Sequence, residues 1–181
     1  MKIKLLILVL ALQSAWLLGT AAMQEHALTT GKVILLETAR IDPRDLLRGD
    51  YLILNYKISD VPTNLFSPPV TKGLPNGAKI YVALAPVTNQ FYAAVKASTN
   101  EFAPAAGEVL LKGRSASGRW NAPTNSIHVE YGLERFYVAE GTGNPTGKLT
   151  AQVVVPASGR GRVREVFVDG KPYAEAMRGI E

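Results

Sequence analysis

Two short stretches of the chain concentrate the side chains that could bind a ligand or transfer a proton. The first places three carboxylates and two guanidinium groups within nine residues: Asp42, Arg44, Asp45, Arg48 and Asp50. The second, about 80 residues further on, contributes Glu130, Glu134 and Arg135. Guanidinium and carboxylate groups form paired, charge-assisted hydrogen bonds, so the two stretches have the chemistry to bind each other or a common ligand.

Three interpretations of these clusters stay open. In the first, Arg–carboxylate pairs tie a helical turn at residues 43–48 to the strand that carries residues 131–138, with Asp42 capping the turn. In the second, both clusters line one groove, in which Tyr51, Tyr137 and the carboxylates bind a ligand or a partner. In the third, Asp50 and Glu134 act as acid and base, as carboxylates about 5 to 10 Å apart do in glycosidases.

Other catalytic and cofactor-binding patterns are missing. The chain has no cysteine, which excludes disulfides, cysteine nucleophiles and thiolate metal sites. Its two histidines, His26 and His128, lie far apart and neither has metal-ligand spacing, and no phosphate-binding or dinucleotide motif is present. We therefore predict neither a metal site nor a cofactor.

The charge of the chain argues against nucleic acid as a partner. The net charge is +5, from 20 Lys and Arg against 15 Asp and Glu. Lys2 and Lys4 belong to an N-terminal leader, and the other basic residues are dispersed, apart from Arg160, Arg162 and Arg164 at one turn. Nucleic-acid binding would need a stronger and more continuous basic surface.

The leader predicts that the chain engages a membrane. Lys2 and Lys4 precede a hydrophobic run from Leu5 to Met23, in which no charge occurs. The run either stays as a single-pass anchor in the inner (cytoplasmic) membrane, or is a signal peptide cleaved near Ala22, which would leave a secreted or periplasmic protein. Both alternatives place the following residues outside the cytoplasm. We divide the chain into the leader (1–23), a polar linker (24–30) and one domain (31–181).

The domain has the sequence pattern of a mainly β protein. Alternating or branched apolar residues predict about eight strands, with proline- and glycine-rich turns between them. In the run from Tyr51 to Ser59, Leu52, Leu54, Tyr56 and Ile58 share the face expected to be buried. Residues 60–78 predict a surface loop, and residues 172–178 a short closing helix. No long amphipathic helix occurs, so we expect an antiparallel barrel or sandwich behind an N-terminal hydrophobic helix.

The stretch Gly49-Asp-Tyr-Leu-Ile-Leu-Asn-Tyr56 resembles the pattern that names the GDYXXLXY family of bacterial membrane-anchored proteins. Its lead-in, Asp42-Pro-Arg-Asp45 with Leu47-Arg48, and a second stretch, Tyr131 to Val138 followed by Glu140-Gly141, also fit that family. The resemblance points to these residues as motif or binding positions: Asp42, Arg44, Asp45, Arg48, Gly49, Asp50, Tyr51, Leu54, Tyr56, Tyr131, Gly132, Glu134, Arg135, Tyr137 and Glu140.

The resemblance implies a single-pass protein with a small extracytoplasmic domain, in a family with no established active site and often encoded near multi-spanning membrane proteins. We expect a noncatalytic envelope protein that binds a membrane-protein partner or a ligand. The alternative is an envelope hydrolase that uses a carboxylate pair. A looser likeness to the β-domain of type I signal peptidases lacks the serine that those enzymes need just beyond the membrane segment.

Overall fold

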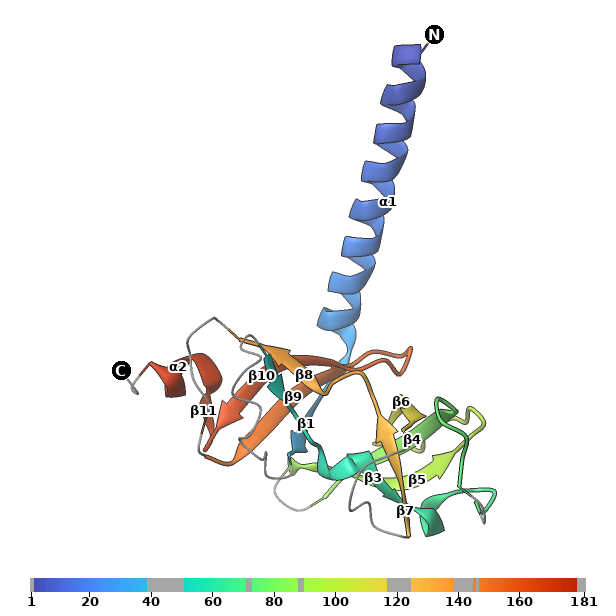
Figure 1. Ribbon diagram of the computed structural model, residues 1–181, viewed down its shortest axis with the longest axis vertical. Coiled ribbons are helices and arrows are strands. Elements are labelled where there is room, and N and C mark those ends of the chain that lie inside the picture. Colours follow the sequence, from blue (N-terminus) through green and yellow to red (C-terminus); the bar gives the residue numbers. More distant parts are fainter. Residues whose placement is uncertain are drawn as a thin grey trace.

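The computed structural model describes residues 2–38, 51–70, 73–87, 90–116, 125–138, 145 and 147–178. One long helix, α1, projects from a body built mainly of β-strands (Figure 1). Helix α1 and the short C-terminal helix α2 span Lys2–Thr30 and Tyr173–Met177. Two 3₁₀ helices, η1 and η2, span Lys57–Ser59 and Thr63–Leu65.

The described residues form eleven strands in three antiparallel sheets. A five-stranded sheet has the order β3-β7-β6-β4-β5, with bounds Asp60–Pro62, Ser126–Glu130, Val109–Ser115, Lys79–Pro86 and Tyr92–Ser98. A four-stranded sheet has the order β1-β9-β10-β11, with bounds Lys32–Glu37, Leu149–Val155, Arg162–Val168 and Lys171–Pro172. The third sheet is a ribbon of β2 (Tyr51–Ile53) and β8 (Arg135–Tyr137).

One buried core joins all three sheets. Leu36 and Val153 from the four-stranded sheet, Leu84 and Leu111 from the five-stranded sheet, and Leu52 from the ribbon belong to the same cluster of buried apolar side chains. The sheets therefore pack as a sandwich around a shared interior, and the described strands do not close into a barrel.

Helix α1 is exposed over its apolar length. Its segment Ile3–Glu25 is long and apolar enough to cross a bilayer, and none of it is buried against the body. Its large side chains, including Leu5 and Trp16, face outward. The helix continues through residues 24–30, where the sequence predicts a polar linker, and passes into β1 after Gly31.

The structure subdivides two of the predicted strands. The run from Tyr51 forms β2, then η1 and β3, and the run across Gly132 forms β7 and β8, with Gly132 at a positive φ of 76° between them. Four of the eleven strands have only two or three residues. Strands this short are below the length at which an alternating pattern identifies them.

The predicted surface loop at 60–78 is wrong in its first part. Asp60–Pro62 is strand β3, paired with β7, and the side chains of Val61 and Phe66 are in the core. The prolines led to the loop prediction, but Pro62 ends an edge strand, a position where a missing N–H is tolerated. The predicted turn at Asn76-Gly77 is present, with Gly77 at a φ of 79°.

Candidate functional site

The two motif stretches meet as neighbouring strands. In the β2–β8 ribbon, Tyr51 lies opposite Tyr137, and Ile53 lies opposite Arg135. The backbone N–H of Leu54 extends this pairing by donating to the carbonyl of Glu134 at 2.7 Å. Backbone pairing therefore joins residues 51–54 to the strand that carries residues 135–137. The helical turn expected at 43–48, and its Arg–carboxylate pairs, lie outside the described residues.

The ribbon has an outer face made of four side chains: Tyr51, Ile53, Arg135 and Tyr137. Residues two apart on a strand point to the same side, so the two cross-strand pairs share one face. The Tyr51 and Tyr137 ring centroids are 6.1 Å apart, and the Arg135 guanidinium lies 5.4 Å from the Tyr51 ring centroid. Tyr137 is 71% exposed and Ile53 is 38% exposed. This outer face presents aromatic, aliphatic and cationic surface to the outside.

The inner face of the ribbon is part of the core. Leu52 is buried, and the Phe136 ring packs edge-on against Tyr173 of α2, with 6.2 Å between the centroids. Leu54, the leucine of the motif, is fully buried. The alternation predicted from the sequence is confirmed for the core-facing set, which fixes the ribbon and leaves its other face toward the surface.

Two motif tyrosines lock the stretches together from inside. The Tyr56 hydroxyl donates to the carbonyl of Leu133 at 2.9 Å, and the Tyr131 hydroxyl donates to the carbonyl of Ile58 at 2.8 Å. Burial is the main cause that raises the pKa of both hydroxyls above the ordinary value for tyrosine, and the charge of Glu134 adds to it. Both tyrosines stay protonated as donors at neutral pH, which is a structural role.

The turn between β7 and β8 depends on Gly132 and Glu134. The Glu134 carboxylate accepts the backbone N–H of Tyr131 at 2.6 Å, and Gly132 adopts a left-handed backbone conformation. A carboxylate bound to a backbone donor in this way shapes the turn. Asp50, its proposed partner in acid–base catalysis, lies outside the described residues.

A mixed-charge groove of about 690 Å³ runs along the same turn. Tyr131, Gly132 and Glu134 form one wall. The charged side chains that line the rest are Lys79, Glu101, Lys112, Arg114, Glu130 and Arg160. Lys112 pairs with Glu101 at 2.8 Å. The second sequence cluster thus contributes Glu130 and Glu134 to a groove, and the charged residues of the first cluster lie outside the described residues.

Seven of the predicted site residues fall outside the described part of the chain: Asp42, Arg44, Asp45, Arg48, Gly49, Asp50 and Glu140. The described ones lie together: Tyr51, Leu54, Tyr56, Tyr131, Gly132, Glu134, Arg135 and Tyr137. Three of them belong to the outer face of the ribbon: Tyr51, Arg135 and Tyr137. The other five have structural roles: Leu54, Tyr56, Tyr131, Gly132 and Glu134. Ile53 is not among the residues predicted from the sequence. Its position two residues after Tyr51, which places both side chains on one face of a strand, is the signal that could identify it.

His128 pairs with Asp60, a contact that the sequence did not suggest. The two residues are direct neighbours in the β3–β7 pairing, and His128 Nδ1 lies 2.7 Å from Asp60 Oδ1. Both side chains are partly buried. In the described residues no third histidine or acidic side chain joins them in a metal-ligating group.

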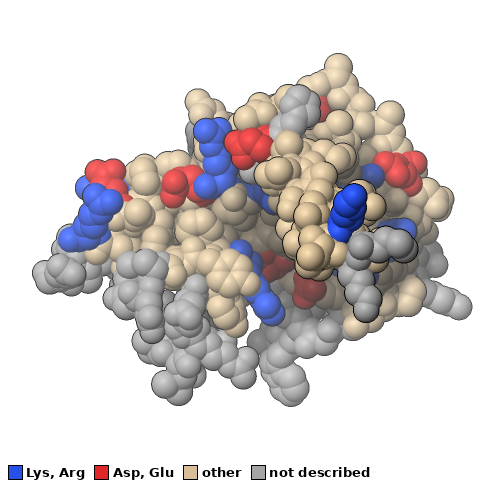
Figure 2. Space-filling view, turned by 90° about the horizontal axis from the view of Figure 1, so that it is seen from above, with Lys and Arg blue, Asp and Glu red and all other residues tan. Residues whose placement is uncertain are grey.

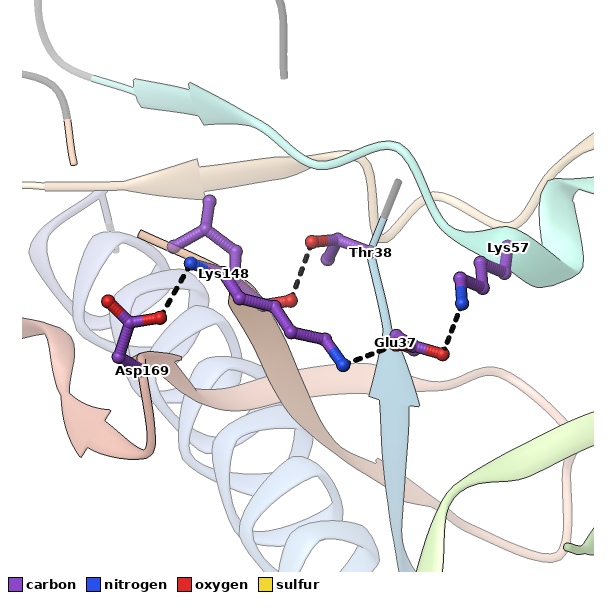
Figure 3. A network of polar contacts seen from close by, with 6 residues as sticks. Glu37, Thr38, Lys57, Lys148 and Asp169 are labelled. Atoms are coloured by element: carbon purple, nitrogen blue, oxygen red, sulfur yellow. Dashed lines mark hydrogen bonds and ion pairs between the residues drawn. The ribbon is translucent and has the colours of Figure 1, made fainter. Parts of the chain in front are cut away.

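A second polar cluster, shown in Figure 3, surrounds Glu37 at the end of β1. Its carboxylate accepts hydrogen bonds from the ammonium groups of Lys57, at 2.6 Å, and Lys148, at 2.5 Å. These two hydrogen bonds, the one from Lys148 first, lower the pKa of Glu37. The backbone N–H of Lys148 donates to Asp169 at 2.8 Å, so the cluster joins β1, η1 and the segments that flank β9 and β10. This cluster is structural.

Comparison with known protein families gives one match. The model of the family described as GDYXXLXY protein matches residues 13–170, which include the C-terminal part of α1, both motif stretches and every strand up to β10. No curated protein and no solved structure is significantly similar to the chain.

Proposed function

The chain belongs to the GDYXXLXY family, and from that premise we propose that it is a noncatalytic, membrane-anchored extracytoplasmic protein whose β2–β8 ribbon binds a membrane-protein partner. The observation that carries this proposal is the outer face of the ribbon. The pairing of the two motif stretches places Tyr51, Ile53, Arg135 and Tyr137 side by side on the surface.

The chemistry of the outer face suits a protein interface. Tyrosine and arginine are enriched among the residues that dominate binding energy, because they bury large areas and also form hydrogen bonds. Tyr137 is 71% exposed, although it directly follows the core-facing Phe136 on its strand. Nothing in the core requires an aromatic residue at this position, so a contact with a partner gives it a role.

The length and exposure of α1 support a partner in the same membrane. The helix segment Ile3–Glu25 can hold the body at the bilayer. Confinement to a membrane surface raises the effective concentration of a partner that is confined there too. A modest surface formed by four side chains is then sufficient for binding.

The hydrolase alternative has no support from a specific observation. It needs a carboxylate that is free to exchange a proton with a substrate. The Glu134 carboxylate instead holds the Tyr131 N–H at 2.6 Å. The groove beside it contains lysines and arginines as well as acids, which is ordinary for a solvated surface.

Crosslinking in native membranes tests the binding proposal. A benzophenone amino acid in place of Tyr137 should capture a multi-spanning membrane protein, identified by mass spectrometry of the crosslinked product. Tyr51→Ala with Ile53→Ala should reduce the yield of that product about tenfold, because removal of an interface anchor costs more than about 1 kcal/mol. The same probe at Val95 on β5, an apolar side chain that is 38% exposed as Ile53 is, serves as the control.

Three outcomes would overturn the proposal. The first is the same product from positions 95 and 137, and the second is a yield unaffected by the two substitutions. The third is unfolding of the double variant, which would make the outer face structural. Intact mass spectrometry of the membrane-bound protein tests anchorage separately: a mass lacking residues 1–22 would show that the leader is cleaved.

A further inference from the structure

A hollow of about 670 Å³ lies between β8 and the connection that leads into β10. Three arginines line it: Arg135, Arg160 and Arg162. Its other walls are mainly backbone and apolar surface, contributed by Leu133, Phe136 and Val163 among others. The hollow shares one wall with the mixed-charge groove and opens beside the outer face of the ribbon.

The charge of this hollow is of one sign. None of its described lining residues is acidic, and within the described chain none of the three guanidinium groups forms an ion pair. Among the described residues, Arg162 donates to a neutral side-chain oxygen, and Arg135 lies against the Tyr51 ring. Three arginines that have no acidic partner in the described part of the chain, next to apolar surface, favour an anion that carries an apolar part.

The hollow is held next to the membrane helix. Arg162 donates from a guanidinium N–H to the side-chain oxygen of Gln24 on α1, at 3.2 Å. The apolar run of α1 ends at Met23, and its 19 residues span about 28 Å, close to the thickness of the hydrocarbon core. A guanidinium bound at Gln24 is therefore at the depth of the phospholipid headgroups.

The turn that carries two of these arginines is fixed to the body. The backbone N–H of Lys112 donates to the carbonyl of Gly159 at 2.8 Å. Gly161 packs so closely that an added Cβ would lie 3.0 Å from Leu111 and 3.1 Å from Val153. Arg160 and Arg162 thus flank a glycine held against the core, and their positions relative to α1 are set by the fold.

The surface around the hollow is not uniformly basic. Figure 2 views the molecule from the side toward which α1 projects and shows lysine and arginine side chains spread among acidic ones. General attraction of a polybasic surface to a membrane would need a continuous positive patch. The acid-free lining is local, which favours a defined site.

We propose that this hollow binds the phosphate of an anionic phospholipid from the membrane that α1 spans, with Arg160 and Arg162 as the main contacts and Arg135 at the rim. The proposal rests on the membrane anchorage of the proposed function. The apolar walls would accept the glycerol and the first part of an acyl chain. Such a site would fix the orientation of the body on the membrane and so direct the outer face of the ribbon along the bilayer.

The test uses the full chain in nanodiscs and benefits from the absence of native cysteine. A fluorophore is attached at Ser158→Cys, which is exposed in the β9–β10 turn, and is quenched by a nitroxide on the lipid headgroups. Quenching should be stronger in phosphatidylcholine mixed with phosphatidylglycerol than in phosphatidylcholine alone. Each of Arg160→Gln and Arg162→Gln should lower the docking constant about fivefold, and both together about twenty-fivefold.

Two controls match this design. Lys96→Gln removes a charge from β5 and should leave the quenching unchanged. A second fluorophore position is Asn64→Cys on η2. Thr63 of η2 donates its backbone N–H to the carbonyl of Asn125, just before β7, in a part of the body far from α1 (Figure 1). Fluorescence from this position should be insensitive to the lipid mixture.

The outcomes separate this proposal from the anchorage on which it rests. Equal quenching in both lipid mixtures, or quenching unaffected by the arginine substitutions, would overturn the lipid site while the chain remained in the nanodisc. Equal loss of signal with Lys96→Gln would show attraction by overall charge and would also overturn it. Recovery of the chain outside the nanodisc, with the leader missing, would refute the anchorage instead.

Discussion

The hydroxyls of Tyr56 and Tyr131 form a reciprocal pair of hydrogen bonds between the two motif stretches, each with a backbone carbonyl near the other tyrosine. Each hydroxyl donates to the carbonyl two residues after the other tyrosine: Tyr56 to Leu133 at 2.9 Å and Tyr131 to Ile58 at 2.8 Å. Both rings are buried, and both carbonyls lie where the strands have ended and no ladder bond is available. The pair therefore satisfies backbone acceptors that the short ribbon β2–β8 leaves open.

Removing either buried hydroxyl should destabilise the fold. Tyr56→Phe and Tyr131→Phe each leave a carbonyl without this partner, which we expect to lower the free energy of unfolding by about 1 to 2 kcal/mol. Urea unfolding of the full chain in detergent measures the change. Tyr137→Phe, on the exposed outer face, is the control and should change it by less than about 0.5 kcal/mol. Equal effects of all three substitutions would contradict the reciprocal lock.

Local alternation in the sequence predicts which of these side chains are buried, but not the long-range hydrogen bonds that they form. The period of two correctly placed Leu52, Leu54, Tyr56 and Ile58 in the core, because alternation is a local property of the chain. The hydroxyl partners of Tyr56 and Tyr131 depend on how two stretches about 75 residues apart are aligned, and no local pattern records that register.

Short strands and long-range contacts account for what the sequence did not reveal. Strand β3 is not predicted because its prolines indicate a loop. No sequence pattern indicates that Arg162 forms a hydrogen bond with Gln24. The tyrosines and Arg135 of the outer face were predicted as binding residues from their types, but only the strand pairing shows that Tyr51 and Tyr137 lie on the same side. The first charge cluster lies outside the described residues, so its role remains a prediction.

Alkaline pH should destabilise the protein through the same two tyrosines. Burial raises the pKa of Tyr56 and Tyr131 in the folded state above the value near 10 of an exposed tyrosine. The unfolded chain then releases these protons at a lower pH than the folded chain does. Their contribution is complete below pH 10 and is lost as the pH rises above it.

Urea unfolding between pH 9 and about 11.5 tests this titration. The double variant Tyr56→Phe with Tyr131→Phe should lose stability less steeply with pH than the natural chain, although it starts from a lower value. Tyr137→Phe is again the control, and it should keep the natural slope. Parallel slopes for the natural chain and the double variant would contradict the assignment.

Two glycines near the site should both be destabilised by alanine, but for different reasons. Gly132 has a φ of 76° and open space around it, so Gly132→Ala is strained by its backbone, at about 1 to 2 kcal/mol. An added Cβ at Gly113 would lie 2.4 Å from Val129 Cγ1 and 2.8 Å from the Glu130 carbonyl oxygen, and Gly113→Ala should cost about 1 to 3 kcal/mol by overpacking.

Asparagine distinguishes the two causes. It adopts the left-handed conformation more readily than alanine, so Gly132→Asn should be less destabilising than Gly132→Ala. At Gly113 the larger side chain adds to the overlap, so Gly113→Asn should be more destabilising than Gly113→Ala. Thermal unfolding of the four variants gives both orders, and the same order at both positions would show that one of the two causes is misassigned.

The cluster around Glu37 should make part of the stability depend on acid pH. The Lys148 and Lys57 ammonium groups lower the pKa of Glu37 in the folded state below its ordinary value of 4.5. A depressed folded pKa gives stability that is complete above the unfolded pKa and is lost as the pH falls through the folded pKa. Both lysines are more than half exposed, so solvent screening should keep the effect of Glu37→Gln below about 1 kcal/mol at pH 7.

The difference in unfolding free energy between the natural chain and Glu37→Gln should therefore shrink as the pH falls from 6 to about 3, and should also shrink in high salt. Glu175→Gln, exposed on α2, is the control in the same urea titrations. A difference that stays constant over this pH range would mean that the Glu37 carboxylate acts through packing and not through its charge.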